Sequence, residues 1–399
     1  MVISDFLVIG GGIIGLSIAR ELKKRYPESR IIVLEKEDKC GLHASGRNSG
    51  VLHAGFYYTT DSFKARFTRI GNQQLTEFCN SNKIPLNNCG KLVVAEKPED
   101  IPKLDELLLR GKNNNVNIHS ITEKEAKEIE PRVKTLDRAL FSPTTSSVDP
   151  SKVMQALSQE VLDLGIQIHH GTRFIKKNDQ AVQTTKGNYE SKYIINVGGL
   201  YADKIAKQFG FSNDYCILPF KGLYLYSKEP PGNLKTHIYP VPDLKNPFLG
   251  VHFTVMANGM SKIGPTAIPA FWREQYTGIN NFHLNEFLEL SLCQAKLFFN
   301  SSFDFKQLAW REIRKYSRAH LVNLASTLLQ DVKISNFKDW GKPGIRAQLL
   351  NIKNNTLEMD FIIEGDHQSI HVLNAVSPAF TCAFPFADHI CNKIEQLTK

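Results

Sequence analysis

The chain has 399 residues, of which 42% are hydrophobic and 22% are charged, and these values are typical of a globular protein. Its length allows about two domains, and no apolar run approaches the roughly 20 residues that a membrane-spanning helix requires. The net charge of +9 comes from dispersed basic residues without a recognition motif, which argues against a nucleic-acid partner and is compatible with acidic substrates or an anionic lipid surface.

The first predicted strand begins almost at the N-terminus, so we expect no cleavable signal ahead of it. The seven cysteines include no C-x-x-C pair and are interpreted as reduced, mostly structural thiols. We expect a cytoplasmic protein without a metal site. Peripheral association with the cytosolic face of a membrane is the alternative location.

Residues 5–20 are predicted to form a strand, a glycine turn and a helix. Gly10, Gly12 and Gly15 fit the pattern G-x-G-x-x-G. The first glycine permits the tight turn, the second lets a pyrophosphate approach the backbone, and the third lets the helix pack on the strand. The helix begins at Ile13 and Ile14, so its free N–H groups and the positive end of its dipole face the phosphates.

A second apolar strand, residues 30–34, is followed by Glu35 and Lys36. Glu35 lies twenty residues after Gly15, where a carboxylate meets the ribose hydroxyls of an adenine dinucleotide. Together these features predict the adenylate-binding part of an FAD or NAD site. They do not distinguish the two cofactors.

Residues 40–58 are rich in Gly, Ser, His, Arg and Tyr. An NAD-binding fold would have its next helix here, whereas small residues suit a backbone pressed against a flat ligand. A surface loop is the alternative, but the position directly after the ribose acid favours a site. We therefore favour a flavin. The residues of this segment expected to contact it are Ser45, Arg47, Asn48, Ser49, Gly50 and Val51.

Later parts of the chain indicate a return to the nucleotide sheet and a second domain. Residues 193–203 repeat the plan of a buried strand, a glycine turn and a helix, which places Gly198 at the cofactor. Strands broken by prolines between residues 216 and 268 indicate an antiparallel sheet. Residues 284–299 and 310–329 are expected to be helical.

The last helix is expected to begin at Ser377, Pro378 and Ala379, with its N–H groups toward the flavin. The predicted fold is an α/β FAD-binding Rossmann-like domain plus an α+β substrate domain with a mainly antiparallel sheet. The FAD-binding domain is expected to be discontinuous. It is assigned residues 1–85, 148–215 and 340–399, and the substrate-binding domain is assigned residues 86–147 and 216–339.

The chain resembles, over nearly its whole length, the FAD-dependent L-2-hydroxyglutarate dehydrogenase/oxidase family, within the D-amino-acid-oxidase-like flavoproteins. The matching stretches include residues 46–55 with Tyr57 and Tyr58, and then residues 62–65, 89–92, 200–203, 219–222, 239–243, 248–254, 264–267, 344–348 and 371–379. Lys221 stands where an Arg is common in the family, which keeps the charge but loses a bidentate fork for a carboxylate.

The resemblance implies FAD and oxidation of L-2-hydroxyglutarate, or a close 2-hydroxy acid, to the 2-oxo acid by hydride transfer to flavin N5. We expect the FAD to be bound noncovalently. The resemblance also implies a small dicarboxylate substrate and an electron acceptor, which is oxygen, a quinone or a carrier. Such a reaction needs cationic groups for the two carboxylates and a base for the substrate hydroxyl.

His53 is the first choice for this base, and the alternative is a histidine that packs on or hydrogen-bonds to the flavin. His252 is the rival base, with an inward strand histidine as its structural alternative. Arg346 is expected to anchor a substrate carboxylate, against the alternative of an ion pair between the domains. Further expected substrate contacts are Tyr58, Tyr239 and Lys221. Arg47 could bind a carboxylate or a phosphate.

Two competing functions stay open at this point. One is an amino-acid, amine or glycerol-3-phosphate oxidase or dehydrogenase of the same flavoprotein group. The other is a flavin-binding subunit without catalysis, associated weakly with a membrane surface. Reduction of the bound flavin by particular small acids separates these functions.

Overall fold

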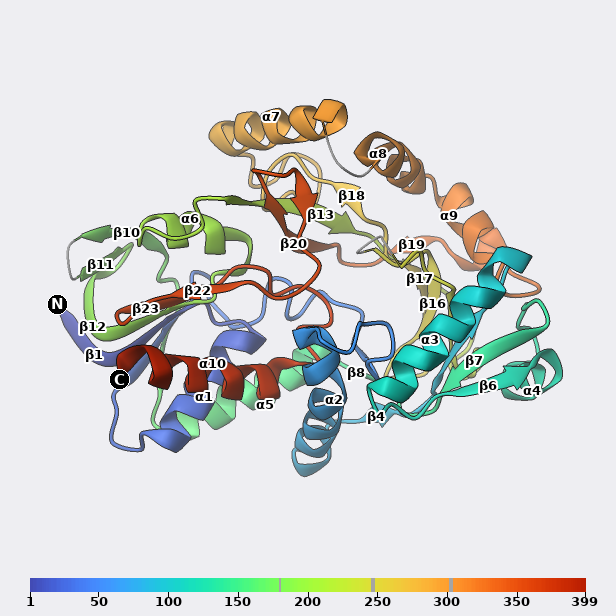
Figure 1. The fold of residues 1–399 in the computed structure, drawn as a ribbon, viewed down its shortest axis with the longest axis horizontal. Coiled ribbons are helices and arrows are strands. Elements are labelled where there is room, and N and C mark those ends of the chain that lie inside the picture. The colour runs from blue at the N-terminus through green and yellow to red at the C-terminus, as the bar shows by residue number, and fades with distance from the viewer. Residues whose placement is uncertain (179–180, 245–247, 301–303) are drawn as a thin grey trace.

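The computed structural model describes residues 1–178, 181–244, 248–300 and 304–399 (Figure 1). At its centre is β1 (Val2–Ile9), which pairs in parallel with β2 (Ile31–Leu34) on one side and with β12 (Gly187–Asn196) on the other. The apolar second half of β1 is buried on both faces, as expected of a parallel strand between two neighbours.

Within the described residues, this first sheet contains eight strands in the order β10-β11-β12-β1-β2-β9, with β23 beside β12 and β22 beside β23. The two pairs β10–β11 and β11–β12 are antiparallel, as is β22–β23. The bounds of the remaining strands are β9 (Gln167–His169), β10 (Phe174–Asn178), β11 (Ala181–Thr184), β22 (Ile363–Gly365) and β23 (Ser369–Val372).

Helices cover one face of this sheet and bury its main core. Val8, Val33 and Ile195 of the strands pack with Leu16 and Ile390 of the helices. Figure 1 shows α1 (Ile13–Arg25), α5 (Pro150–Asp163) and α10 (Ala383–Thr398) side by side below the sheet. The helix α2 (Phe63–Ser81) packs against α10, and the short α6 (Ala202–Lys207) packs against β12 and β23. The predicted return of the chain to the first sheet is confirmed, because β12 pairs with β1.

The second sheet has the order β19-β14-β17-β16-β15-β5-β7-β6 in the described part of the chain. Its pairs are antiparallel except for β5–β15, so the expected mainly antiparallel sheet is confirmed. The strands are β5 (Lys91–Val94), β6 (His119–Thr122), β7 (Arg138–Ser142), β14 (Leu225–Tyr226), β15 (His237–Pro240), β16 (His252–Val255), β17 (Ser261–Gly264) and β19 (Asp339–Trp340).

Two smaller sheets connect these parts. One joins β13 (Tyr215–Gly222) to β20 (Gly344–Asn351), with β18 (Ile268–Pro269) and β21 (Thr356–Leu357) at its edges. The other joins β3 (Val51–Leu52), β8 (Ser146–Val148) and β4 (Leu86–Asn87).

The domain boundary expected at residue 340 falls within β19. β19 pairs with β14, and β20 pairs along its length with β13. The hydrophobic pattern of β20 predicts a strand but not its partner, because several sheets can accept the same apolar strand.

The remaining helices lie around the second sheet and the small sheet of β13 and β20. They are α3 (Ile101–Asn113), α4 (Glu123–Ile129), α7 (Leu284–Asn300), α8 (Phe305–Ile313) and α9 (Arg318–Ala325). The helix expected over 310–329 is interrupted, because Ser317 leaves the helical conformation and caps α9. None of the helices in the described ranges has the length and apolar character needed to cross a bilayer.

Candidate active site

A single elongated cavity of about 1530 Å³ extends from the glycine turn after β1 to the strands β16 and β20. Pockets for drug-sized ligands have volumes of roughly 300–1,000 Å³, so this cavity has room for a dinucleotide and a small substrate together. Its walls include Gly10, Glu35, His53, His252 and Arg346, which the sequence singled out from distant parts of the chain.

The glycine turn has the geometry that its sequence predicts. A Cβ atom on Gly15 would lie 2.0 Å from the carbonyl oxygen of Gly10, and one on Gly10 would lie 2.5 Å from the carbonyl oxygen of Val197. Gly10 also has a φ of +124°, which L side chains rarely adopt. A Cβ on Gly12 would approach only Ser45 Oγ, at 3.1 Å, so this side of the turn is open for a ligand.

Glu35 closes the far end of the turn. Its Oε2 accepts a hydrogen bond of 3.0 Å from the Gly11 N–H, and its Oε1 accepts one of 2.9 Å from the Glu37 N–H. Burial raises the pKa of this carboxyl, and the two N–H donors oppose that rise. The carboxylate is thus fixed at the cavity wall, where ribose hydroxyls can donate to it.

The segment that follows is held by its own hydrogen bonds. Ser45 Oγ accepts the Ile13 N–H at 2.9 Å, and Asn48 donates to the Ser45 carbonyl at 2.8 Å and accepts the Gly50 N–H at 2.8 Å. Ser49 and Val51 also line the cavity, whereas Gly50 does not. Gly50 provides a turn of positive φ, +77°.

Arg47 is committed to protein partners. It donates to the carbonyl oxygens of Leu42 at 2.7 Å and Pro343 at 3.3 Å, and its guanidinium lies 4.4 Å from the centre of the Tyr276 ring. Arg47 therefore supports the loop over the cavity.

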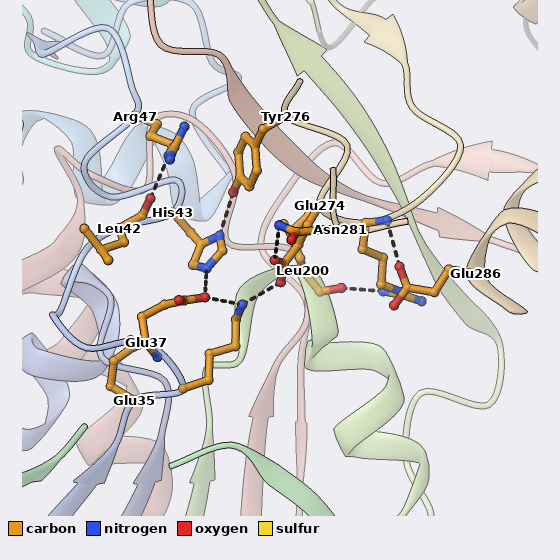
Figure 2. Close-up of polar contacts among 12 residues, drawn as sticks. Glu35, Glu37, Leu42, His43, Arg47, Leu200, Glu274, Tyr276, Asn281 and Glu286 are labelled. Carbon is orange, nitrogen blue, oxygen red and sulfur yellow. Dashed lines mark hydrogen bonds and ion pairs between the residues drawn. The ribbon is translucent and has the colours of Figure 1, made fainter. Parts of the chain in front are cut away.

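A polar bridge joins this loop to the segment after β18 (Figure 2). His43 contacts the Tyr276 hydroxyl at 2.6 Å and Glu37 at 2.8 Å, and Lys36 contacts Glu37 at 2.6 Å and Glu274 at 2.5 Å. Glu37, His43 and Glu274 each offer one atom of a kind that binds metal ions, and these three atoms lie within 4.8 Å of one another. The Lys36 ammonium already supplies a positive charge beside Glu37 and Glu274. Lys36 thus acts in this bridge as well as lining the cavity.

The buried pair of Arg273 and Asp203 anchors the same segment to α6. The guanidinium donates to both carboxylate oxygens, at 2.7 and 2.8 Å, and also to the Leu200 carbonyl. Both side chains are fully buried. Breaking such a pair is costly because the remaining charge stays buried without compensation, so the segment is held firmly against the cofactor side of the cavity.

The opposite end of the cavity contains His53, just after β3. Its backbone N–H donates to Thr381 Oγ1 at 3.2 Å, and its carbonyl accepts from Asn72 at 3.3 Å. Its ring atom Nδ1 is buried and has no hydrogen-bond partner among the described residues. Burial lowers the pKa of His53 well below its usual range, and the nearby Lys91 charge lowers it further.

His252, the first residue of β16, is held in one tautomer. Its Nδ1 lies 2.8 Å from the Gly250 carbonyl, which can only accept, so Nδ1 carries the proton and Nε2 keeps a lone pair. Burial lowers the pKa of His252 to about 3, with the Gly250 contact opposing. Tyr239 of β15 stacks on this ring with a centroid distance of 3.6 Å.

Lys91 lies behind Tyr239 and was missed as a site residue. Its fully buried ammonium is 4.2 Å from the centre of the Tyr239 ring, 5.2 Å from Tyr57 and 5.6 Å from Phe56. Among the described residues Nζ has no hydrogen-bond partner, and burial lowers its pKa to about 7. Lys91 stands in the matched stretch of residues 89–92, but a lysine at the start of a predicted strand indicates no burial.

Arg346 of β20 and Tyr58 lie on the cavity wall close enough to interact electrostatically. Removal of water around the guanidinium lowers the pKa of Arg346 to about 10, and the Tyr58 phenol opposes this shift. The Phe248 ring centre lies 5.1 Å from the guanidinium carbon. Lys64 of α2 lines the same part of the cavity and was also missed.

Lys221 and residues 377–379 lie differently from what the sequence predicts. Lys221 does not line the cavity: on β13 its neighbour Phe220 does, while the Lys221 ammonium lies 6.0 Å from the Tyr316 ring on another side. Side chains alternate along a strand, so a shift of one position exchanges the two faces. Ser377, Pro378 and Ala379 line the cavity, but α10 begins only at Ala383, and the Ala379 N–H donates to the Val376 carbonyl.

The adenylate end fits FAD on the geometry of the turn itself. The space over Gly12 is open where a Cβ would otherwise stand, Glu35 is fixed at the wall, and Gly198 lies across the turn with its N–H bonded to Asn196. At the other end of the cavity, the buried His53 Nδ1, for which the described part of the chain supplies no hydrogen-bond partner, adds a polar group.

Comparisons with known proteins agree with this geometry. The family described as "DAO: FAD dependent oxidoreductase" matches residues 5–392. Proteins named L-2-hydroxyglutarate dehydrogenase are similar along nearly the whole chain. One from Indibacter alkaliphilus is 36% identical and aligns over 96% of this chain and 97% of its own length, and one from Escherichia coli strain K12 is 32% identical over 98% and 93%. The mitochondrial protein of that name from Mus musculus is 35% identical over 98% and 88%.

Solved structures show the same fold at lower identity. L-alpha-glycerophosphate oxidase from Mycoplasma pneumoniae with FAD bound has a TM-score of 0.79 at 22% identity, covering 99% of this chain and 95% of that one. Glycine oxidase from Geobacillus kaustophilus has a TM-score of 0.75 at 18% identity, with the same coverage. These likenesses support the predicted architecture of an FAD-binding part and a substrate part.

Proposed function

The chain belongs to the DAO family of FAD dependent oxidoreductases, and on that premise we propose that it oxidises L-2-hydroxyglutarate to the 2-oxo acid with FAD as the first electron acceptor. The observation that carries the proposal is the cavity itself. It joins the glycine turn and Glu35 at one end to two neutral histidines and the cationic Arg346 at the other. Relatives with that substrate in their names, at 32–36% identity over nearly the full length, support it.

FAD, when bound, supplies the hydride-accepting ring. The residues that would hold its adenylate part are Gly10, Gly12, Ile13, Ile14, Gly15, Glu35, Lys36 and Gly198. Those that would lie along the rest of it are Ser45, Arg47, Asn48, Ser49, Val51, Ser377, Pro378 and Ala379. All of them line the cavity, and none needs a covalent bond to the cofactor, so we propose noncovalent binding.

The substrate end performs binding and proton transfer. The Arg346 guanidinium offers a planar fork to a carboxylate, and Tyr58 and Tyr239 place hydroxyl groups on the same wall. The base must be neutral in order to accept the hydroxyl proton. Both histidines satisfy this condition near pH 7, because burial holds the pKa of each below its usual range.

His53 is the proposed base and His252 its rival. The His53 Nδ1 has no partner among the described residues, so its ring is free to accept a proton there or at Nε2. His252 is committed at Nδ1 and can accept only at Nε2. A stopped-flow comparison of the two alanine variants, described below, separates them.

Anaerobic reduction of the bound flavin tests the proposed function. The FAD-loaded protein is mixed with L-2-hydroxyglutarate, D-2-hydroxyglutarate, glycine, L-proline or glycerol 3-phosphate, and the visible flavin band is followed. We expect bleaching by the L-enantiomer alone. Bleaching by an amino acid or by glycerol 3-phosphate, without bleaching by L-2-hydroxyglutarate, would establish the alternative oxidase. If no compound bleaches the band, the flavin-binding subunit without catalysis is favoured.

We propose further that the electrons leave to a respiratory quinone at an anionic membrane surface. The support is a set of exposed apolar side chains, called here the apolar stripe, on α7 and α8. These two helices lie along the upper edge of Figure 1, away from α1, α5 and α10. Leu292 is 72% exposed, Phe299 79% and Trp310 69%. The same two helices carry the exposed basic residues Lys296, Lys306 and Arg311. Apolar side chains beside basic ones suit an anionic bilayer surface.

Sedimentation with vesicles tests this second proposal. We expect binding to phosphatidylglycerol-containing vesicles, no binding to phosphatidylcholine alone, and loss of binding in the double variant Leu292→Glu/Phe299→Glu. Oxygen consumption during turnover without any quinone would show instead that oxygen is the acceptor. A dimer that dissociates in the double variant, with no vesicle binding, would assign the stripe to a second copy of the chain.

A further inference from the structure

Lys64 is a buried cation on the cavity wall to which the proposed reaction has so far assigned no role. It is the second residue of α2, it is 4% exposed, and it stands in the matched stretch of residues 62–65. A cation at the N-terminal end of a helix is electrostatically unfavourable, because the helix dipole is positive there. Burial of the side chain adds a desolvation cost.

The protein supplies little negative charge to offset this cation. The Lys64 ammonium donates to the neutral Met359 carbonyl at 2.5 Å. Asp360 is the neighbouring carboxylate, but its oxygens accept the backbone N–H groups of Phe63, Lys64 and Phe361, at 2.7, 3.2 and 2.9 Å. Burial lowers the pKa of Lys64 to about 7, the Arg346 charge lowers it further, and Asp360 opposes both.

Arg346 presents the second cation to the same cavity. It comes from β20, far from α2 in the sequence, and its guanidinium lies against the Phe248 ring. Two desolvated cations that repel each other are stabilised when an anion binds beside each of them. A monocarboxylate supplies one such anion, and a dicarboxylate supplies two.

We infer that Lys64 binds the distal carboxylate of the substrate while Arg346 binds the carboxylate next to the reacting carbon, so that Lys64 determines the preference for a dicarboxylate. This inference rests on the proposed function for the identity of the substrate. The planar fork of Arg346 suits the carboxylate whose orientation must be fixed for reaction, and the point charge of a lysine suits a tail that needs only to be held.

Binding of unreactive analogues tests the inference without any turnover. Glutarate and valerate have five carbons each and lack the hydroxyl group, and they differ in the distal carboxylate. Their dissociation constants are measured from the change they cause in the flavin spectrum of the FAD-loaded protein. For the unmodified protein we expect glutarate to bind about 10- to 100-fold more tightly, as for a charged hydrogen bond.

In Lys64→Met we expect glutarate to lose about 10- to 100-fold in affinity while valerate binding changes little, so that the preference disappears. Lys64→Arg keeps the cation and should keep most of the preference for glutarate. If Lys64→Met does not fold, this variant still provides a test, because a lost preference in Lys64→Arg would count against the inference. Lys221→Met removes another buried lysine, one outside the cavity, and should leave the ratio of the two affinities unchanged. Kinetics with L-2-hydroxyglutarate and L-2-hydroxyvalerate should show the same pattern in kcat/KM.

Equal weakening of both ligands in Lys64→Met, or a glutarate preference that survives the substitution, overturns the inference. These outcomes are distinct from a failure of the proposed function. In that case L-2-hydroxyglutarate does not reduce the flavin, although glutarate binding still depends on Lys64.

Discussion

The two ends of the cavity are built in different ways. At the adenylate end the chain turns at Gly10, Gly12 and Gly15, and Glu35 and Ser45 accept N–H groups of the turn and of the first residue of α1. All these residues lie within the first 50 of the chain. Backbone geometry forms this end, and the side chains of Glu35 and Ser45 already have partners inside the protein.

The substrate end is assembled from side chains of distant elements. His53 follows β3, Lys64 is on α2, His252 is on β16 and Arg346 is on β20. Several of its polar atoms are buried without a hydrogen-bond partner among the described residues, including His53 Nδ1, Tyr57 Oη and Lys91 Nζ. Unsatisfied buried groups lower stability, and they persist where a ligand completes them.

Residues at the adenylate end hold the cofactor as part of the folded backbone. Residues at the substrate end gain their missing interactions only when the substrate binds. Substitutions at the adenylate end should therefore change FAD affinity and stability. Substitutions at the substrate end should change the reaction and leave the flavin bound. The variants below test this division.

The largest effect is expected from loss of the base. His53→Ala should keep FAD bound but slow flavin reduction by about 10²- to 10⁴-fold, as for a missing general base. His252→Ala is the matched comparison, and if His53 is the base it should slow reduction less. Stopped-flow absorbance under anaerobic conditions measures both. Unaltered reduction in His53→Ala would transfer the role to His252.

The second largest effect is expected for Arg346→Ala. It should raise KM and lower kcat/KM by roughly 100-fold or more, about 3 kcal/mol, as for a lost charged hydrogen bond. The flavin content of the purified variant should equal that of the unmodified protein. A kcat/KM within a few-fold of the unmodified protein would remove Arg346 from the site.

The two glycine variants should separate folding from cofactor binding. Gly15→Ala places a Cβ 2.0 Å from the Gly10 carbonyl and should lower the free energy of unfolding by about 1–3 kcal/mol. Gly12→Ala meets only Ser45 Oγ, so the apoprotein should keep its stability while FAD binding weakens by about 10-fold or more. Urea unfolding and fluorescence titration with FAD measure the two effects. Equal FAD affinity in Gly12→Ala would place the cofactor elsewhere.

An effect on stability of the opposite sign is expected for Lys91→Met. The pKa of Lys91 falls from 10.5 to about 7 on burial. Between these values the unfolded chain binds the additional proton, so the penalty that Lys91 places on the folded state grows as the pH decreases from about 10 and is complete below about 7. The methionine should therefore raise the free energy of unfolding by about 1–3 kcal/mol at pH 6, and by less at pH 9.

Urea unfolding of the FAD-loaded protein at the two pH values measures this gain. A loss of stability at pH 6 would show that the nearby rings of Phe56, Tyr57 and Tyr239 stabilise the Lys91 ammonium. Flavin reduction by the variant provides a second measurement. Because the Lys91 charge lowers the pKa of His53 and His252, its removal should move the acidic limb of the rate profile to higher pH.

The same division explains what could be predicted from the sequence. The glycine turn, β2 and Glu35 were predictable because their spacing determines their geometry over short distances. The return at β12 was predictable because it repeats the same local plan. The partner of β20 was not, because an apolar strand pattern does not specify its neighbour. Lys64 and Lys91 were missed because nothing local distinguishes a buried lysine from a solvated one. Lys221 was expected at the substrate, but on β13 its neighbour Phe220 lines the cavity instead.

A crystal structure of the FAD-loaded protein with glutarate would show whether one cavity binds the adenylate at its glycine end and a dicarboxylate at its cationic end. We expect ribose hydroxyls at Glu35, one glutarate carboxylate on Arg346 and the other on Lys64, with His53 and His252 beside the ligand. Glutarate bound outside this cavity, or bound in it without contact to Arg346, would overturn both assignments.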